Sequence, residues 1–386
     1  MKSTLFISAL LATTMAVASC NSSNAKPIKD ETNEKPKPSE NNKIQVALLL
    51  DTSNSMDGLI DQAKSRLWNI VNTLTTLKYS GKNPDIEIAL YEYGNDGLAQ
   101  QSNYIRQVTP LTTDLDLISE KLFALKTNGG NEYCGAVIQD ATKKLQWGTA
   151  NNNMKLIYIA GNEAFNQGGI NYKEAISDAM KNDIYVNTIF CGNSMEGINT
   201  FWKDGADYGK GKYFNIDSNL SVKYVSTPYD DQISQCNVKI NTTYIGYGSK
   251  GSSKKMNQET QDRNAQKLSS ANYAERAVSK SKAVYKNESW DLVDRMKEDS
   301  KAISKIKKEE LPAELQNKSQ AELEVIVKQK TKERESIQKE IGELGKKRQQ
   351  YIDAEAKKSK SQDDLGNAIN TSIVALAKVK GYTVEK

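Results

Sequence analysis

The feature that most constrains the fold is a regular alternation of short apolar runs with amphipathic segments, which begins at Lys43. Residues 44–50 form an apolar run of the kind found in strands that are buried on both faces. From Met56 to Leu77 the apolar residues then recur at i, i+3, i+4 and i+7, which predicts one amphipathic helix of about six turns. Since a strand buried on both faces needs helices above and below its sheet, this opening pair predicts an α/β protein.

The same alternation continues through the first half of the chain. We expect further strands at residues 86–93, 155–160 and 184–191, an antiparallel companion at 105–108, and helices at 115–125, 135–147 and 172–181. Residues 200–217 fit a last helix and strand. The pattern predicts a doubly wound, mostly parallel sheet within residues 44–222, with ligands at the carboxyl ends of its strands.

Composition removes most catalytic chemistry. The chain has 386 residues and no histidine, which excludes a Ser-His-Asp triad, a histidine general base and a histidine-ligated zinc. We therefore expect no enzyme. The net charge of +5, from 53 basic and 48 acidic residues, is small. Nucleic-acid binding normally needs a stronger or more localised basic excess, so we expect no nucleic-acid partner.

The N-terminal segment is expected to be removed from the mature protein. Lys2 gives a positive start, residues 5–17 form an apolar stretch too short for a comfortable membrane span, and small residues precede Cys20. Residues 1–19 resemble a bacterial lipoprotein signal peptide, which implies that Cys20 is lipidated. Residues 20–43 have the composition of a flexible tether. The alternative is an ordinary signal peptide with an incidental cysteine.

Candidate chemistry follows the first strand directly. Asp51, Ser53 and Ser55 form a D-x-S-x-S pattern in the turn between that strand and the long helix. One carboxylate and two hydroxyls at alternate positions can point at a common centre, and such hard oxygen ligands suit Mg²⁺, Mn²⁺ or Ca²⁺. The small number of ligands leaves room for water and for an incoming ligand.

In this position the motif resembles the start of the metal-ion-dependent adhesion site of the von Willebrand factor A (vWA) domain family. The resemblance covers residues 44–222 and implies a bound divalent cation, with Mg²⁺ expected first and Mn²⁺ or Ca²⁺ as alternatives. It also implies ligands from two later loops. Glu132 stands in the first loop, where the family often has threonine, and Asn162 or Glu163 stands in the second, where Gly161 replaces the family's aspartate.

Charge separates these acidic candidates. Asp51 and Glu132 together would neutralise a divalent ion, and Glu163 would add a third negative charge that weakens the pull of the ion on an incoming carboxylate. We therefore expect Glu132 near Asp51, Ser53 and Ser55, with Glu163 turned away or acting through water. The alternative is a degenerate vWA domain that binds no metal.

Three further cysteines follow Cys20, at positions 134, 191 and 236. In an oxidising compartment one disulfide and one free thiol are plausible, and the sequence alone does not fix the pair. Cys134 and Cys191 both fall at the edge of the sheet that carries the candidate site, so a bridge between them would brace the ligand loop. Two buried free thiols are the alternative.

The remaining residues, 223–386, are rich in helix formers. A marginal coiled coil or helical hairpin is expected at about 313–357, and a last amphipathic helix at 368–377. Residues 257–259, 274–278 and 290–294 resemble segments that follow the vWA domain in envelope proteins of Bacteroidetes-type bacteria.

These observations lead to a functional hypothesis. We expect a lipoprotein anchored to a bacterial membrane, the outer rather than the inner one, with its vWA domain outside the cytoplasm. That domain is expected to bind a partner protein whose acidic side chain completes the shell of the cation. The alternative is a structural envelope protein in which the vWA domain is a metal-free scaffold and the helical region mediates assembly.

Overall fold

The computed structural model describes residues 42–357 and 365–385. Its centre is a six-stranded sheet with the strand order β4-β3-β1-β5-β6-β7. The strands are β1 (Lys43–Asp51), β3 (Asp85–Tyr93), β4 (Ile105–Thr112), β5 (Met154–Gly161), β6 (Ile184–Cys191) and β7 (Lys210–Ile216). All neighbours are parallel except β3 and β4. The expected doubly wound, mostly parallel sheet is confirmed.

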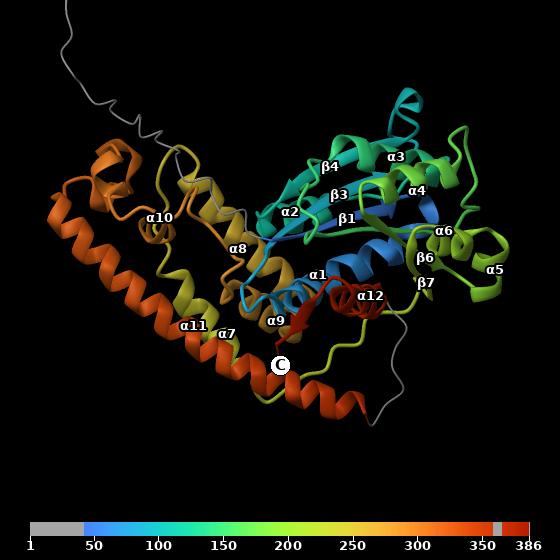
Figure 1. The fold of residues 1–386 in the computed structure, drawn as a ribbon. Coiled ribbons are helices and arrows are strands. Elements are labelled where there is room, and N and C mark those ends of the chain that lie inside the picture. The colour runs from blue at the N-terminus through green and yellow to red at the C-terminus, as the bar shows by residue number, and fades with distance from the viewer. Residues whose placement is uncertain (1–41, 358–364, 386) are drawn as a thin grey trace, which may run out of the picture. The chain divides into compact units, whose positions relative to one another are not determined.

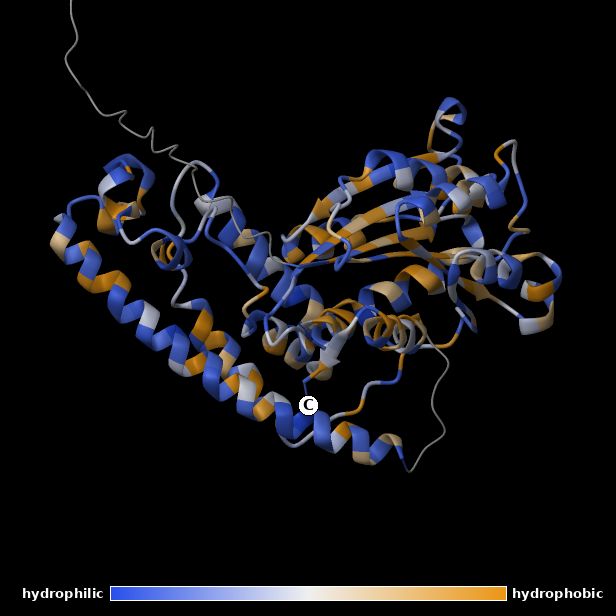
Figure 2. Cartoon of the chain, in the orientation of Figure 1, coloured by the Kyte–Doolittle hydropathy of each residue, from blue (hydrophilic) through white to orange (hydrophobic). Residues whose placement is uncertain are grey.

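Alternation along the strands divides the core into two layers. In β1, Val46, Leu48 and Leu50 belong to one apolar cluster, whereas Ala47 and Leu49 belong to the other. The second cluster is covered by α3 (Cys134–Lys144), α4 (Tyr172–Lys181) and α6 (Trp202–Tyr208), with the short α5 (Ser194–Asn199) before α6. The first is covered by α1 (Asp57–Thr75), α2 (Leu115–Ala124) and α12 (Leu365–Val379). Figure 1 shows these helices on both sides of the sheet, and Figure 2 shows its apolar strands.

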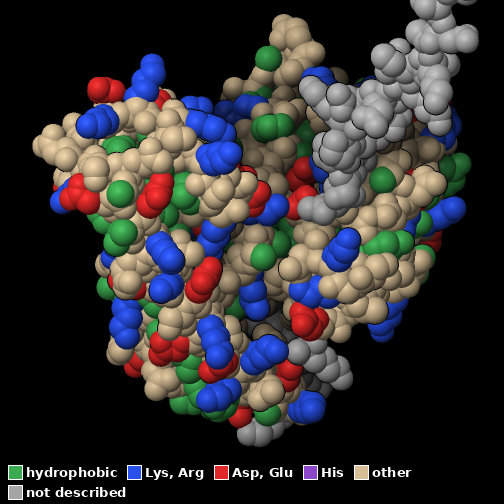
Figure 3. All heavy atoms as spheres, turned by 60° about the vertical axis from the view of Figure 1, so that its left-hand side comes forward, with side chains coloured by type: hydrophobic (Ala, Val, Ile, Leu, Met, Phe, Trp, Pro, Cys, Tyr) green, Lys and Arg blue, Asp and Glu red, His purple; other side chains and the backbone are tan. Residues whose placement is uncertain are grey.

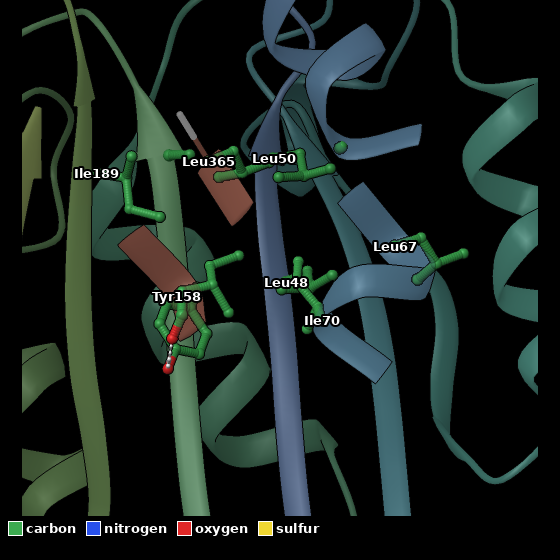
Figure 4. Close-up of a pocket in the computed structure, with 10 residues that line it drawn as sticks. Leu48, Leu50, Leu67, Ile70, Tyr158, Ile189 and Leu365 are labelled. Carbon is green, nitrogen blue, oxygen red and sulfur yellow. Dashed lines mark hydrogen bonds between the residues drawn. The ribbon is translucent and has the colours of Figure 1, made fainter. Parts of the chain in front are cut away.

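The helix that completes the first layer comes from the end of the chain. After β7 the chain leaves the sheet, and α12 then returns to contact β5, β6 and β7. In Figure 4 Leu365 of α12 lies near Tyr158 and Ile189 of the sheet, around a small apolar cavity that Ile369 of α12 also lines. The Tyr158 and Ser372 hydroxyls lie 2.5 Å apart. The short β8 (Tyr382–Val384) then pairs with β2 (Leu77–Tyr79).

The segment between β7 and α12 is helical and packs onto the same body. It contains α7 (Asp230–Asn241), α8 (Gly251–Leu268), α9 (Ser270–Lys280), α10 (Leu292–Glu298) and α11 (Gln320–Ala356). α9 contacts α1 and α7, and α11 contacts α7 and α10. All described residues fall in one compact unit.

α11 corrects one expectation. It is a single continuous helix of 37 residues. Of the coiled coil or helical hairpin expected at about 313–357, the hairpin is therefore wrong, and the coiled coil stays a prediction. The buried Leu323 and Val327 of α11 join an apolar cluster with α10, and its Ile341 and Leu344 join the first core layer. These apolar positions are therefore used by contacts within the chain.

Buried ion pairs fix the added helices to the sheet domain. The Arg276 guanidinium is buried and lies 2.8 Å from the Asp116 carboxylate of α2 and 2.5 Å from the Asp262 carboxylate of α8. The central carbon of this guanidinium, Cζ, is 4.6 Å from the centre of the Trp68 ring of α1. Removing one partner of such a group leaves an uncompensated buried charge, which is why the pairing specifies how α9 docks.

The outer surface carries charges of both signs. Lys and Arg side chains alternate with Asp and Glu side chains over the face shown in Figure 3. Within residues 42–357 and 365–385, no helix is both long and apolar enough to cross a membrane.

We predict that the packing of α12 on the sheet contributes to the stability of the fold. Ile373 is fully buried in the first core layer, so Ile373→Ala should lower the free energy of unfolding by about 2–5 kcal/mol. Chemical denaturation measures this, with Val379→Ala as control, because Val379 is 74% exposed and its substitution should stay within about 0.5 kcal/mol of wild type. Equal effects of the two variants would contradict a closing role for α12.

Candidate metal site

The site begins where β1 ends. Asp51 is the last residue of β1 and its side chain is 0% exposed. Its Oδ1 accepts a hydrogen bond from the Ser53 backbone N–H at 2.7 Å, which closes a tight turn. The Thr52 N–H donates to the Tyr93 carbonyl at 2.9 Å and so ties this turn to the end of β3. Local hydrogen bonds thus hold the Asp51 carboxylate at the carboxyl edge of the sheet.

The two serines of the motif meet the loop that follows β5. The Ser53 and Ser55 hydroxyl oxygens lie 3.4 Å apart. The Asn162 side-chain N–H donates to the Ser55 hydroxyl at 3.2 Å. Asn162 is half-buried and Ser55 is exposed, so this side of the site opens to solvent.

Glu132 reaches the same place from the loop before α3. Its side chain is only 3% exposed. A Cβ added to Gly94, whose φ is +76°, would lie 2.7 Å from Asp51 Oδ1 and 2.8 Å from Glu132 Cγ. Glycine is therefore required at position 94 for its backbone conformation and to let the two acidic side chains approach.

Burial and mutual proximity change the acidity of this pair. Burial, and next the charge of Glu132, raise the pKa of Asp51 well above its usual value. Burial also raises the pKa of Glu132, although hydrogen bonding with Asp51 and Ser53 opposes this. The pair can be satisfied by a shared proton or by a cation, since two buried carboxylates that are both ionised repel each other.

Three buried oxygen atoms at this edge lack a hydrogen-bond partner among the described residues: Asp51 Oδ2, Glu132 Oε2 and Asn162 Oδ1. Buried acceptors are nearly always satisfied, so such a group needs an explanation. Two carboxylates and an amide oxygen beside two hydroxyls form a donor set that suits a hard divalent cation. The residues present therefore fit the ion that the vWA resemblance implies.

The donor set is unusual in its composition. Within the described residues, no group of three or more His, Cys, Asp or Glu is arranged to hold a metal ion. The candidate site has only two carboxylates, and its other oxygen donors are hydroxyls and an amide. A bound ion would therefore not be over-neutralised by the protein.

Glu163 lies outside the group. It is exposed, and its carboxylate accepts a hydrogen bond from the Gln167 side chain at 3.1 Å. Its backbone carbonyl accepts from the Trp202 indole N–H at 2.7 Å. The structure thus brings Asp51, Ser53, Ser55, Glu132 and Asn162 together and directs the Glu163 carboxylate elsewhere. Whether these residues bind an ion stays a prediction.

Tyr93 lies near the site and was not singled out from the sequence. A Cβ at Gly161 would lie 2.5 Å from the Tyr93 hydroxyl and 3.2 Å from Asp51 Oδ2. The buried Tyr93 hydroxyl donates to the Ala160 carbonyl at 3.0 Å. Tyr93 thus fills the space beside Gly161, the position at which the family has its aspartate. A tyrosine at the end of a predicted strand carried no signal for this role.

The possible bridge between Cys134 and Cys191 is not formed, and the structure has the alternative of buried free thiols. Cys134, Cys191 and Cys236 are all buried free thiols. Cys134 belongs to the second core layer, with its Sγ 3.9 Å from the Tyr93 hydroxyl, whereas Cys191 belongs to the first layer. Although both residues lie at the same edge, they project to opposite faces of the sheet. The expected signal peptide, Cys20 and most of the tether lie outside the described residues.

Comparison with known proteins identifies the sheet domain. Residues 45–225 match the family model of the von Willebrand factor type A domain. The vWA resemblance is confirmed for this segment. No curated protein matches the sequence.

Several solved structures are similar to part of this chain at low identity. An aerotolerance-related membrane protein of Bacteroides fragilis is 18% identical, with a TM-score of 0.31, over 46% of this chain and 93% of its own. The proximal thread matrix protein 1 of the mussel byssus, with a zinc-occupied MIDAS motif, is 14% identical, with a TM-score of 0.34, over 45% of this chain and 42% of its own. A pilus adhesin of Lactobacillus rhamnosus GG is 12% identical, with a TM-score of 0.35, over 46% of this chain and 28% of its own.

We predict that Tyr93 makes Gly161 obligatory. Gly161→Ala should lower the free energy of unfolding by about 1–3 kcal/mol through overpacking. The loss should be smaller in a Tyr93→Phe background, because the hydroxyl that the new Cβ would meet is gone. Denaturation of the four proteins in this double-mutant cycle measures the coupling.

Gly169→Ala is the matched control, since a Cβ there meets nothing within 4 Å. It should change stability by no more than about 0.5 kcal/mol. The same loss for Gly161→Ala with and without the Tyr93 hydroxyl would show that Tyr93 is not the constraint.

Proposed function

We propose that this protein, whose residues 45–225 form a von Willebrand factor type A domain, binds a partner protein through a divalent cation. The observation that carries the proposal is the convergence of buried oxygens without hydrogen-bond partners at Asp51, Glu132 and Asn162, within the described residues. Because such oxygens cost free energy unless they are satisfied, a site that keeps three of them together is best explained by a ligand.

Asp51 and Glu132 would hold the ion by charge, while Ser53, Ser55 and Asn162 would add neutral oxygen donors. When bound, the cation supplies a positive centre that attracts an acidic side chain of the partner. The exposed hydroxyl of Ser55 lies on the side from which such a side chain would approach. The Glu163 carboxylate accepts a hydrogen bond from Gln167, so it is not among the proposed ligands, although its charge still acts on Glu132. We propose Mg²⁺ first, with Mn²⁺ and Ca²⁺ as alternatives.

Binding fits this site better than catalysis does. The chain contains no histidine to accept a proton from Ser53 or Ser55. A metal-free structural scaffold is the alternative; there a proton shared by Asp51 and Glu132 would satisfy the two carboxylates, and Asn162 Oδ1 would stay without a partner among the described residues.

We further propose that the domain is anchored in a bacterial envelope, at the outer membrane and outside the cytoplasm. The sequence of residues 1–20 supports a lipoprotein signal, and residues 20–43 support a tether between lipid and domain. The sheet begins at Lys43, directly after that tether.

Removal of metal should distinguish the two hypotheses. Wild type should gain thermal stability in millimolar Mg²⁺ or Mn²⁺ relative to chelator, since a ligand at a hundred times its Kd adds about 2.7 kcal/mol. Asp51→Ala and Glu132→Gln should lose this difference, whereas Glu163→Gln should keep it. The quantity to compare is Tm with metal minus Tm with chelator. This difference is needed because Asp51→Ala and Glu132→Gln each also remove the repulsion between the two carboxylates in the metal-free protein. Equal Tm values for wild type in both conditions would favour the metal-free scaffold.

The partner proposal has its own test. Protein captured from envelope extract by immobilised wild type should be released by chelator and should not be captured by Asp51→Ala. Glu163→Gln should capture as wild type does. Capture that is indifferent to chelator and to Asp51→Ala would contradict binding through the ion.

The anchor is tested by fractionation of cells. Cys20→Ser should move the protein to the soluble fraction or block its maturation, because acyl chains provide about 0.8 kcal/mol of membrane affinity per buried CH₂. Cys236→Ser, at a buried free thiol, should leave the distribution unchanged. A Cys20→Ser protein that resists a high-salt wash of the membranes would rule out lipid anchoring.

A further inference from the structure

A second cavity lies at the opposite end of the sheet from Asp51. It has a volume of about 370 Å³ and opens between α12 and the amino-terminal halves of β5, β6 and β7. Its walls are formed by Leu156, Tyr185, Asn187, Lys210, Gly211, Lys212, Ser372, Ala375, Leu376 and Val379. We call this cavity the α12 groove. Its volume falls in the range of about 300–1,000 Å³ that is usual for small-molecule sites.

The floor and one wall of the α12 groove are apolar. Leu156 of β5 is buried in the first core layer, and Tyr185 and Leu376 pack against that layer while remaining half-exposed. Ala375 and Val379 of α12 continue the wall toward solvent. The polar atoms of the floor are already engaged: the Ser372 hydroxyl bonds to Tyr158, and the Asn187 side chain bonds to the backbone of Lys212 and Ile157. The floor therefore offers apolar contact rather than hydrogen bonds.

The mouth of the groove is cationic. Lys210 and Lys212 are exposed, and their side chains have no ion-pair partner within the described part of the chain. A third lysine, Lys380, lies nearby with its Nζ 5.2 Å from the centre of the Tyr185 ring, but it is paired with Asp183 at 2.5 Å. Two uncompensated positive charges thus stand beside an apolar cavity.

The backbone fixes where these two lysines stand. The Lys212 N–H donates to the buried Asn187 side chain at 3.0 Å. A Cβ on Gly211 would lie 2.0 Å from the Val186 carbonyl oxygen, so the glycine between the lysines lets β7 approach β6 closely. The two ammonium groups are mobile on their stems, but both originate at the rim of the same cavity.

We propose that the α12 groove binds an anionic amphiphile of the fatty-acid class, with its acyl chain along Leu156, Tyr185 and Leu376 and its carboxylate at Lys210 and Lys212. Burial of the acyl chain would favour binding because it removes apolar surface from water, and the two ammonium groups would select a negative head group. A neutral polar ligand would find few free hydrogen-bonding groups on the floor. The site shares no residue with the candidate metal site and does not depend on it.

Isothermal titration calorimetry with sodium dodecanoate, below its micellar concentration, tests this proposal. Wild type should bind dodecanoate with one site, and dodecyltrimethylammonium, which has the same chain and the opposite charge, should bind at least tenfold more weakly. Equal binding of dodecanoate and dodecyltrimethylammonium, or no binding of dodecanoate, would overturn the proposal.

Variants locate the binding to the groove. Lys210→Glu/Lys212→Glu should weaken dodecanoate binding at least tenfold, and Ala375→Trp should weaken it by filling the cavity. Lys328→Glu/Lys332→Glu on α11 makes the same change in net charge at exposed positions far along the chain, and should bind as wild type does. Equal weakening by the two double variants would show that binding depends only on net charge, and would refute the groove.

Two further measurements separate this inference from the function proposed above. Thermal melts should show that Lys210→Glu/Lys212→Glu folds as wild type does, because both side chains are exposed. Dodecanoate binding should be the same in chelator and in Asp51→Ala. Loss of binding in Asp51→Ala would mean that the fatty acid occupies the metal site, which would overturn the assignment to the α12 groove.

Discussion

The whole structure depends on the burial of both faces of its central strand. From Ile44 to Asp51 every residue of β1 is buried, so helices must cover the sheet on both sides. The segment up to β7 supplies this cover only in part. α12, from the end of the chain, completes the layer over β5, β6 and β7. The helices between β7 and α12 are therefore part of one folding unit with the sheet, rather than an appended stalk.

Much of this architecture follows from patterns in the sequence, because strands and helices are set by local periodicity. The strand ending at Asp51 and the helix after it were predicted from the spacing of apolar residues. The docking of α12 was not, since an amphipathic helix records that one face is buried but not which surface buries it. Side chains alternate between the two faces of β6, so Cys191 lies on the face opposite to Phe190. From the sequence, Cys134 and Cys191 were placed only at the same edge of the sheet, without regard to the face that each one occupies. The Tyr93 hydroxyl was missed because its contact with Gly161 joins two strands, β3 and β5, that are not sequence neighbours.

The candidate site combines two opposing demands. Burial raises the pKa of Asp51 and of Glu132, so without an ion the pair favours a shared proton over two negative charges. A divalent cation removes the same repulsion by neutralising both carboxylates. The absence of an aspartate at Gly161 lowers the number of charges that the domain directs at the ion. The second carboxylate of the candidate site instead belongs to Glu132, in the loop before α3. The site therefore keeps two carboxylates, although the position of the family's aspartate is occupied by Gly161.

The return of α12 also bears on how the site is held. The Gln62 side chain, buried in α1, accepts a hydrogen bond from the Leu365 N–H at the start of α12 at 3.1 Å. Its amide N–H groups donate to the carbonyls of Asp217 and Leu220, at 2.8 and 3.2 Å, in the turn after β7. α1 begins at Asp57, two residues after Ser55, so any displacement of α1 that moved the two serines would break these bonds. These bonds join α1, the helix that follows the D-x-S-x-S turn, to the start of α12 and to the turn after β7, and buried hydrogen bonds are costly to leave unmade. The position of the D-x-S-x-S turn is therefore coupled to the docking of α12, a helix from the other end of the chain.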